Sequence, residues 1–200
     1  MTYRTIVADP PWDHSDGTGF SYGLADPRGR SGTHGPSSHS LPYPVMTVEE
    51  ISALPVGDLA TKDADLFLWT TNRFLRDAYG VAEAWGFTPS TVCVWCKPHN
   101  QGLFGGRFLS NVEFFLYARR GSPGYLDKCG TRWFTWPRGA HSAKPEAFID
   151  LVETISLGPY LELFARRQRL GWDTWGNEAL EHIEDERFLA AVLSDVEITG

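Results

Sequence analysis

The residues whose types are best suited to binding or catalysis lie near the beginning of the sequence. An apolar run at residues 5–8 ends in Asp9, Pro10, Pro11 and Trp12. The run is rich in β-branched residues and predicts a buried strand, which must stop at Asp9 because proline cannot continue a sheet ladder. Open α/β sheets form their binding sites at the carboxyl ends of strands. We therefore expect Asp9 to lie in such a site.

The turn at residues 9–12 suits the binding of a planar group that carries an NH2. The Asp9 carboxylate and the Pro10 carbonyl are acceptors for its two N–H bonds, and we expect the carbonyls of the turn to be free and to face outward. The indole of Trp12 offers a flat surface for stacking. An exocyclic amine of a nucleobase has this shape, and two acceptors on its hydrogens favour a pyramidal nitrogen with an exposed lone pair. The structural alternative is a strand end with a capping acid, two turn prolines and a core tryptophan.

The tetrad at residues 9–12 resembles the Asp-Pro-Pro-Trp motif of methyltransferases that act on amino groups. More narrowly, the chain is similar to the MT-A70 family of S-adenosylmethionine-dependent adenine-N6 methyltransferases. Further segments like those of the family follow in the same order and bring the resemblance to roughly residues 3–178. These segments are residues 42–47, 66–72, 84–87, 94–97, 141–146, 162–166, 171–172 and 175–178.

The resemblance implies roles for several of these residues. Asp9, Pro10, Pro11 and Trp12 would form the catalytic motif, with Asp9 also near the methionine end of the cofactor. Tyr43 matches a tyrosine at the target-base pocket of the family, so the adenine would lie between Trp12 and Tyr43 or a nearby aromatic ring. The methyl group would pass in line from sulfur to nitrogen, and water can then remove the proton.

The resemblance also implies a binding site for S-adenosylmethionine. Lys144 precedes a predicted helix, where both its charge and the helix end favour the carboxylate of the cofactor. Glu162 lies inside a predicted strand and needs a cation, which would be Lys144 or another. Arg166 and Asn177 match positions that could hydrogen-bond the ribose hydroxyls, and Glu178 could contribute as well.

The order of the elements predicts the fold class. Strands alternate with helices, which favours an α/β fold with a mixed, mostly parallel sheet flanked by helices. There is no Gly-rich turn near the N-terminus, so a Rossmann-like methyltransferase with permuted motif order is expected, as in the family. The catalytic strand comes first and the cofactor strand, residues 160–164, comes last. We expect a methyltransferase domain at residues 1–178 and an acidic helix or tail at residues 179–200.

Composition and charge limit the partners. A hydrophobic content of 42% and an aromatic content of 14% are typical of a globular protein. The net charge is −7, but residues 178–200 carry seven acidic side chains and one basic, so the preceding body is nearly neutral. Binding of a long duplex by charge alone is therefore not expected, whereas recognition of one unstacked base is compatible. No membrane span or signal peptide is predicted, so we expect a cytoplasmic protein.

No metal site is predicted. Cys93 and Cys96 have a spacing seen in zinc sites, but they lie in a predicted strand, where residues three apart point to opposite faces. The histidines of the polar stretch that follows the tetrad are expected to be solvated. They are His14, His34 and His39.

The function predicted from the resemblance is methyl transfer to N6 of adenine in nucleic acid, with DNA slightly favoured over RNA. The sequence shows no separate target-recognition domain, so tight specificity would need the loops or a protein partner. Three alternatives stay open. They are a non-catalytic binding or scaffold subunit, a methyltransferase for another amine such as cytosine N4 or a protein amide, and a nucleotide-binding module without transfer chemistry.

Overall fold

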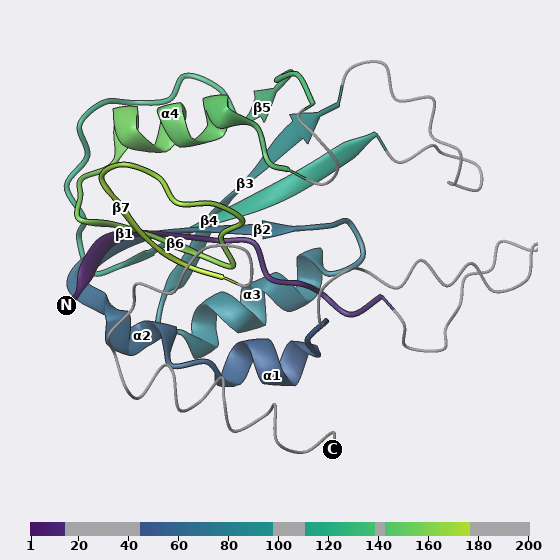
Figure 1. The fold of residues 1–200 in the computed structure, drawn as a ribbon, viewed down its shortest axis with the longest axis horizontal. Coiled ribbons are helices and arrows are strands. Elements are labelled where there is room, and N and C mark those ends of the chain that lie inside the picture. Colours follow the sequence, from purple (N-terminus) through teal and green to yellow (C-terminus); the bar gives the residue numbers. More distant parts are fainter. Residues whose placement is uncertain (15–44, 98–110, 139–142, 177–200) are drawn as a thin grey trace, which may run out of the picture.

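The computed structural model describes residues 1–14, 45–97, 111–138 and 143–176 (Figure 1). In these ranges seven strands form one sheet. The strands are β1 (Tyr3–Ala8), β2 (Ala60–Thr70), β3 (Thr88–Cys96), β4 (Val112–Arg120), β5 (Trp133–Phe134), β6 (Tyr160–Leu163) and β7 (Trp172–Trp175). The helices are α1 (Val48–Ala53), α2 (Val56–Leu59), α3 (Leu75–Ala84) and α4 (Glu146–Ile155).

Several predictions fall outside the described residues. They concern Tyr43, Asn177 and Glu178, the histidines His34 and His39, and the acidic residues 179–200. The division into a domain at residues 1–178 and an acidic segment therefore stays a prediction. None of the helices in the described residues is long and apolar enough to cross a membrane.

The first strand lies in the middle of the sheet. The strand order is β5-β3-β4-β2-β1-β6-β7. β1 pairs in parallel with β2 and β6, β6 with β7, and β3 with β5, whereas β4 is antiparallel to β2 and β3. Of the seven strands, β4 alone runs against the others, so the predicted α/β class with a mixed, mostly parallel sheet is confirmed. The amino end of β4 therefore meets the carboxyl ends of the other strands at one edge.

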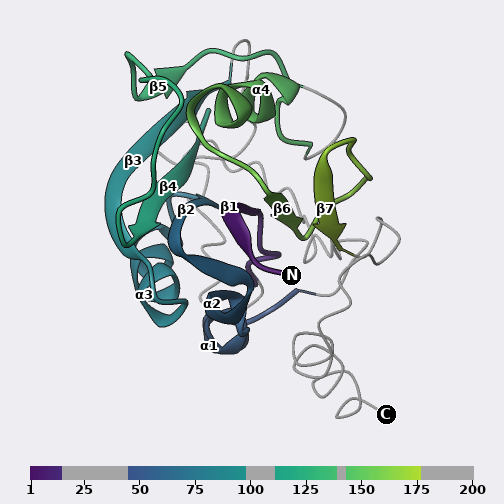
Figure 2. The same cartoon turned by 90° about the vertical axis from the view of Figure 1, so that its left-hand side faces the viewer.

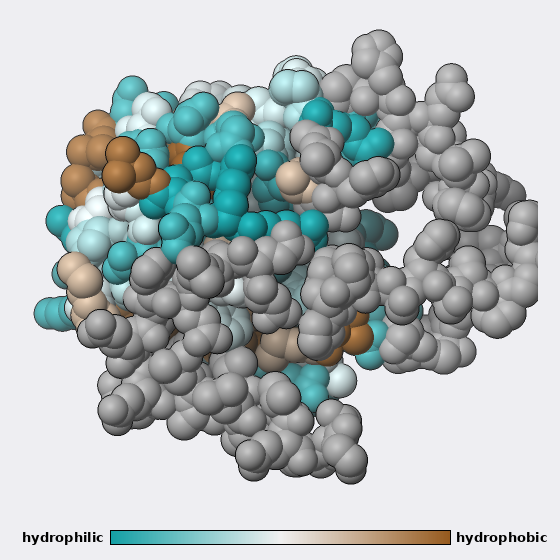
Figure 3. Space-filling view, viewed as in Figure 1, coloured by the Kyte–Doolittle hydropathy of each residue, from teal (hydrophilic) through white to brown (hydrophobic). Residues whose placement is uncertain are grey.

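Helices cover both faces of this sheet (Figure 2). The helices α1 to α3 pack on one face, where Ile6 and Ala8 of β1 lie in the hydrophobic core. The helix α4 packs on the other face, where Val7 contacts a second core. β1 is thus buried on both sides, which explains its unbroken apolar sequence. Figure 3, in the view of Figure 1, shows hydrophilic residues below α4 in the middle of the molecule, and an apolar patch around the left-hand end of this helix.

The predicted ends and faces of the helices agree only in part with the structure. The sequence from Thr47 to Glu50 predicts a capping box, and the structure has it at the start of α1. Asn72 predicts the cap of the next helix, but α3 begins later, with Phe74 at the position before its first residue. The apolar spacing of this helix predicts that Tyr79 faces the core, which is wrong. Tyr79 is 41% exposed, and Val81 is buried instead.

The Arg120 side chain ties the end of β4 to the helical layer below it. Its guanidinium donates hydrogen bonds to the carbonyl oxygens of Gly57, Trp85 and Gly86 over 2.7, 3.2 and 3.2 Å. Gly86 has a positive φ of 79°, and a Cβ at this position would lie 2.4 Å from an Arg120 nitrogen. The close approach therefore requires glycine at the turn between α3 and β3.

We expect Arg120→Met to lower the free energy of unfolding by roughly 2–3 kcal/mol, because three carbonyl groups lose a charged donor. Arg119→Met is the matched control, since Arg119 is an exposed neighbour on the same strand. Chemical denaturation of both variants measures the difference. Equal stabilities for the two variants would contradict the structural role of Arg120.

Candidate active site

The chain leaves β1 as a tight turn at the edge where the carboxyl ends of the strands meet. The Asp9 N–H donates to the Leu163 carbonyl at the end of β6. The Pro10 carbonyl accepts the N–H of Trp12 over 2.9 Å, and the Pro11 carbonyl accepts the N–H of Met46 over 2.9 Å. The prediction that both carbonyls of the turn are free was therefore wrong. Each carbonyl oxygen still has a second lone pair, so the Pro10 carbonyl can accept one more hydrogen bond.

Trp12 belongs to the core. The residue is 4% exposed, its ring stacks on Phe74 with centroids 5.3 Å apart, and its Nε1–H donates to the Trp69 carbonyl over 3.1 Å. The expectation that Trp12 offers an open face to a base was therefore wrong, and the structural alternative holds for this residue. Its part in the motif is to anchor the turn, since a buried indole with a satisfied N–H fixes the chain that carries Asp9.

Lys144 lies between two carboxylates. Its Nζ is 2.8 Å from an Asp9 oxygen and 3.4 Å from a Glu113 oxygen. The residue comes directly before α4, as predicted, with Pro145 at the position before the first helical residue. Its ammonium also lies 5.2 Å from the centre of the Trp69 ring. One cation thus joins the turn after β1, the start of β4 and the start of α4.

Glu113 extends this cluster by one more charge. Its carboxylate contacts the Lys97 ammonium as well as Lys144, and the Lys97 ammonium lies 4.9 Å from the centre of the Trp95 ring. Asp9, Lys144, Glu113 and Lys97 therefore alternate in sign. We call these four residues the charge cluster. The sequence did not predict a role for Glu113 or Lys97, although an acidic residue inside an apolar strand is a visible signal.

The pKa directions show that Lys144 and Glu113 are ionised at neutral pH. Burial by itself would lower the pKa of Lys144, but Asp9 and Glu113 outweigh it and raise this pKa above its ordinary value. Burial by itself would raise the pKa of Glu113, but Lys144 and Lys97 lower it below its usual range. Both groups therefore keep their charges over a wide pH range.

Glu162 finds a cation other than Lys144. It lies on β6 beside Val7 of β1, and its carboxylate is 3.9 Å from Nε of Arg169. Arg169 donates to Glu146 at the start of α4 over 2.8 Å. Of the two predicted alternatives for Glu162, pairing with another cation is the one observed. Arg169 was not predicted, because it lies in a basic run where no single residue stands out.

One atom of each partner in this pair has no hydrogen bond within the described residues. They are Oε2 of Glu162 and Nε of Arg169, and both are buried. Burial raises the pKa of Glu162, Arg169 opposes this shift, and the nearby charge of Asp9 adds to it. A buried polar atom without a partner is unfavourable, so this place suits a ligand with hydroxyl groups.

The structure brings Asp9, Lys144 and Glu162 to one edge of the sheet, on the face covered by α4. Arg166 follows the same strand end as Glu162 and is half-buried. Tyr43, Asn177 and Glu178 lie outside the described residues, so their roles stay predictions.

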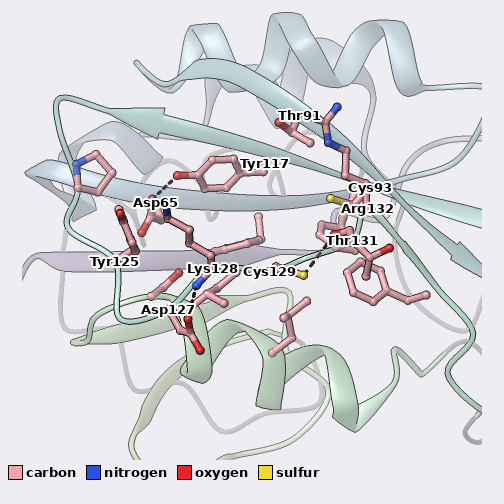
Figure 4. Close-up of a pocket in the computed structure, with 17 residues that line it drawn as sticks. Asp65, Thr91, Cys93, Tyr117, Tyr125, Asp127, Lys128, Cys129, Thr131 and Arg132 are labelled. Carbon is pink, nitrogen blue, oxygen red and sulfur yellow. Dashed lines mark hydrogen bonds between the residues drawn. The ribbon is translucent and has the colours of Figure 1, made fainter.

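A hollow of about 310 Å³ lies between the sheet and the chain that joins β4 to β5 (Figure 4). It is also lined by the last turn of α4. The Tyr117 hydroxyl donates to the Asp65 carboxylate there over 2.8 Å, and burial raises the pKa of Asp65. Asp65 pairs with Thr5, four residues before Asp9, which is about 13 Å along a strand. Phe115, two residues from Glu113, lines the hollow as well, so the hollow extends along the sheet from Asp65 toward the charge cluster.

Cys93 also lines this hollow, and Cys96 lies half-buried further along β3. Burial raises the pKa of the Cys93 thiol to about 11, so it is protonated at neutral pH. No group of three or more metal-ligating side chains occurs among the described residues.

Comparison with known proteins decides the family. Residues 3–178 match the model of the MT-A70 family. The chain belongs to this family. The predicted family and its Rossmann-like methyltransferase fold are thus confirmed, and so is the prediction that the protein is a methyltransferase.

Relatives of this MT-A70 protein share about a quarter to a third of its sequence. The type II methyltransferase M.MunI of a Mycoplasma species is 34% identical over 88% of this chain and 77% of the relative. The N6-methyladenosine RNA methyltransferase MTA1 of Cryphonectria parasitica is 27% identical over 92% of this chain and 54% of the relative. The human N(6)-adenine-specific methyltransferase METTL4 is 26% identical over 94% of this chain and 40% of the relative. The chain thus spans most of the first relative and about half of the other two.

We expect Lys144→Met to destabilise the protein by roughly 1–3 kcal/mol at pH 7, since two half-buried carboxylates lose their shared cation. The pKa of Glu113 is lowered by folding, so its ion pairs stabilise the fold above its unfolded value of 4.5 and lose this effect as the pH falls. The deficit of the variant should therefore shrink between pH 5 and about pH 3, where Glu113 takes up a proton.

Denaturant unfolding at several pH values measures this dependence. Lys62→Met, which removes an exposed lysine of β2, is the control and should change stability little at any pH. A deficit of Lys144→Met that is the same at pH 4 and pH 7 would contradict the assignment.

Proposed function

We propose that this protein transfers the methyl group of S-adenosylmethionine to N6 of adenine in nucleic acid, with DNA preferred to RNA. The observation that carries the proposal is the pairing of Asp9, from the Asp-Pro-Pro-Trp motif, with a charged Lys144 at 2.8 Å. This pair lies where the carboxyl ends of the strands meet, which is the place where α/β sheets bind ligands. The names of the relatives support adenine as the acceptor.

The residues present fit the cofactor. When bound, S-adenosylmethionine supplies an electrophilic methyl group on its sulfonium. Lys144 would bind the cofactor carboxylate with its remaining N–H, and Asp9 would bind the ammonium. Oε2 of Glu162 and Nε of Arg169, which make no hydrogen bond within the described residues, suit the ribose hydroxyls, because one accepts and the other donates. Arg166, Asn177 and Glu178 are proposed as further contacts from their places in the family motifs.

The acceptor nitrogen would be held by Asp9 and the Pro10 carbonyl. Asp9 accepts one N–H bond of the adenine amine and the second lone pair of the Pro10 carbonyl accepts the other. Pro11 and Trp12 fix the turn rather than contact the base, so stacking falls to Tyr43 or another aromatic residue. Positioning of this kind contributes roughly 7–11 kcal/mol in favourable cases, and fixed acceptors stabilise the positive charge that develops on nitrogen. Water then takes the proton.

The preference for DNA is supported by the relatives. The type II methyltransferase of Mycoplasma shares more identity with this chain, and over a larger part of its own length, than the fungal RNA methyltransferase does. Tight sequence specificity would come from the loops or from a protein partner.

We expect Asp9→Asn to lower kcat by roughly 10²–10³ because the amide offers one acceptor instead of a charged carboxylate. The assay is mass-spectrometric detection of N6-methyladenine after incubation with adenine-containing DNA and RNA strands, with adenine-free strands as the substrate control. Asp150→Asn, an exposed substitution on α4, is the protein control and should keep full activity. Unchanged turnover by Asp9→Asn, or methylation of the adenine-free strands alone, would overturn the proposal.

A further inference from the structure

The hollow between the sheet and the chain that joins β4 to β5 contains one buried acidic side chain, Asp65 (Figure 4). Asp65 is 4% exposed, and its carboxylate accepts the hydroxyl hydrogen of Tyr117 over 2.8 Å. Among the described residues no lysine or arginine forms an ion pair with Asp65, and Arg4 acts on it only through its more distant charge. A buried aspartate usually pairs with a cation, so Asp65 suits a positively charged ligand in the hollow.

The charge of Asp65 is compensated only in part. Burial raises the pKa of this carboxyl, and the hydrogen bonds of Tyr117 and Ser156 and the charge of Arg4 lower it by less. The carboxylate is therefore less stable in this place than it is in water. A cation in the hollow would stabilise it.

Aromatic rings form the sheet side of the hollow. Phe67 of β2, Phe115 and Tyr117 of β4 and Phe134 of β5 all lie on the face that carries α4. The centre of the Phe67 ring is 5.4 Å from that of Tyr117 and 6.4 Å from that of Phe115. Aromatic rings attract cations to their faces, and they also cover the apolar part of a ligand. The lining therefore suits an organic cation with an apolar body.

The size of the hollow and the charges at its rim agree with a small cation. A volume of about 310 Å³ is at the lower end of the range for ligand pockets, so it suits one ring with a short chain. Lys128, Arg132 and Asp127 line the rim and are exposed. Water and salt screen these three charges, whereas the buried charge of Asp65 is screened much less.

A buried ring stands between the hollow and the charge cluster. None of the four residues of the cluster is among the described residues that line the hollow. The centre of the Trp69 ring is 5.1 Å from that of Phe115 and 5.2 Å from the Lys144 ammonium, and Trp69 is 1% exposed. A ligand in the hollow is therefore expected to leave the proposed cofactor site open.

We propose that the hollow binds a small aromatic amine, with its ammonium on the Asp65 carboxylate and its ring among Phe67, Phe115 and Phe134. The amine donates hydrogen bonds to a carboxylate that already accepts one from Tyr117, which a carboxylate with two oxygens allows. The inference goes beyond the proposed function and does not depend on it.

The first test compares three molecules of nearly equal shape. They are the cation phenethylamine, the neutral 2-phenylethanol and the anion 3-phenylpropionate. NMR titration of the ¹⁵N-labelled protein measures the Kd of each. We expect saturable binding of phenethylamine with shifts at residues 91–93 and 125–132, and at least about tenfold weaker binding of the other two. Equal affinity for the amine and the alcohol, or tighter binding of the anion, would overturn the inference.

The second test uses variants of the lining. Asp65→Asn removes the charge and keeps an acceptor for Tyr117, so it should weaken phenethylamine binding at least about tenfold. Leu151→Trp fills the hollow from α4 and should abolish binding without changing any charge. The control is Asp127→Asn, which removes the exposed carboxylate of the same lining and should bind as the wild type does. Wild-type affinity in either folded variant would overturn the inference. Circular dichroism reports folding, and Leu151→Trp decides if Asp65→Asn is unfolded.

A titration with saturating S-adenosylmethionine separates this inference from the proposed function. We expect the Kd of phenethylamine to stay the same, because the two sites are distinct. Displacement of the amine by S-adenosylmethionine would place it in the cofactor site and overturn the inference. Amine binding that depends on Asp65, in a protein that does not methylate adenine, would contradict the proposed function alone.

Discussion

The arrangement of this site depends on one shared cation. Lys144 holds the carboxylates of Asp9 and Glu113, which come from two strands that run in opposite directions. Two half-buried carboxylates so close together would repel each other without it. Lys97 adds a second positive charge on the far side of Glu113. The Asp9 carboxylate is thereby fixed in direction, which is what an acceptor for an amine requires.

The fold supplies the positions that this cation needs. β1 is buried between two hydrophobic cores, so the turn that follows it cannot shift along the sheet. Trp12 fixes the other side of the turn through its buried ring and its bond to the Trp69 carbonyl. Because β4 runs antiparallel to its neighbours, its amino end places Glu113 beside the carboxyl end of β1. Lys144 comes from the chain just before α4, which packs on this face of the sheet. A second pair, Glu162 and Arg169, lies beside the cluster. One acceptor and one donor atom of this pair make no hydrogen bond within the described residues and could bind a polar ligand.

The sequence predicted those parts of the site that depend only on residues close together in the chain. The apolar run before Asp9 indicated a strand because burial on both faces needs apolar residues on both sides. The capping box of Thr47 and the proline after Lys144 predicted where helices begin. The pairing of Lys144 with Glu113 could not be predicted, since it depends on the direction and register of β4. The burial of Trp12 was equally hidden, because the type of a residue does not tell which neighbours cover it. A charged Glu162 inside a strand predicted a cation as its partner. The choice of Arg169 from the basic run around it depends on the tertiary structure and could not be predicted.

The central claim is that the charge cluster around Lys144 forms the cofactor site. Isothermal titration of the folded protein with S-adenosylmethionine at pH 7 tests it most directly, with Lys144→Met and the exposed-site variant Lys62→Met beside the wild type. The account predicts saturable one-to-one binding by the wild type and by Lys62→Met, and at least a roughly tenfold weaker affinity for Lys144→Met. Equal affinity in Lys144→Met, or no binding by the folded wild-type protein, would contradict it.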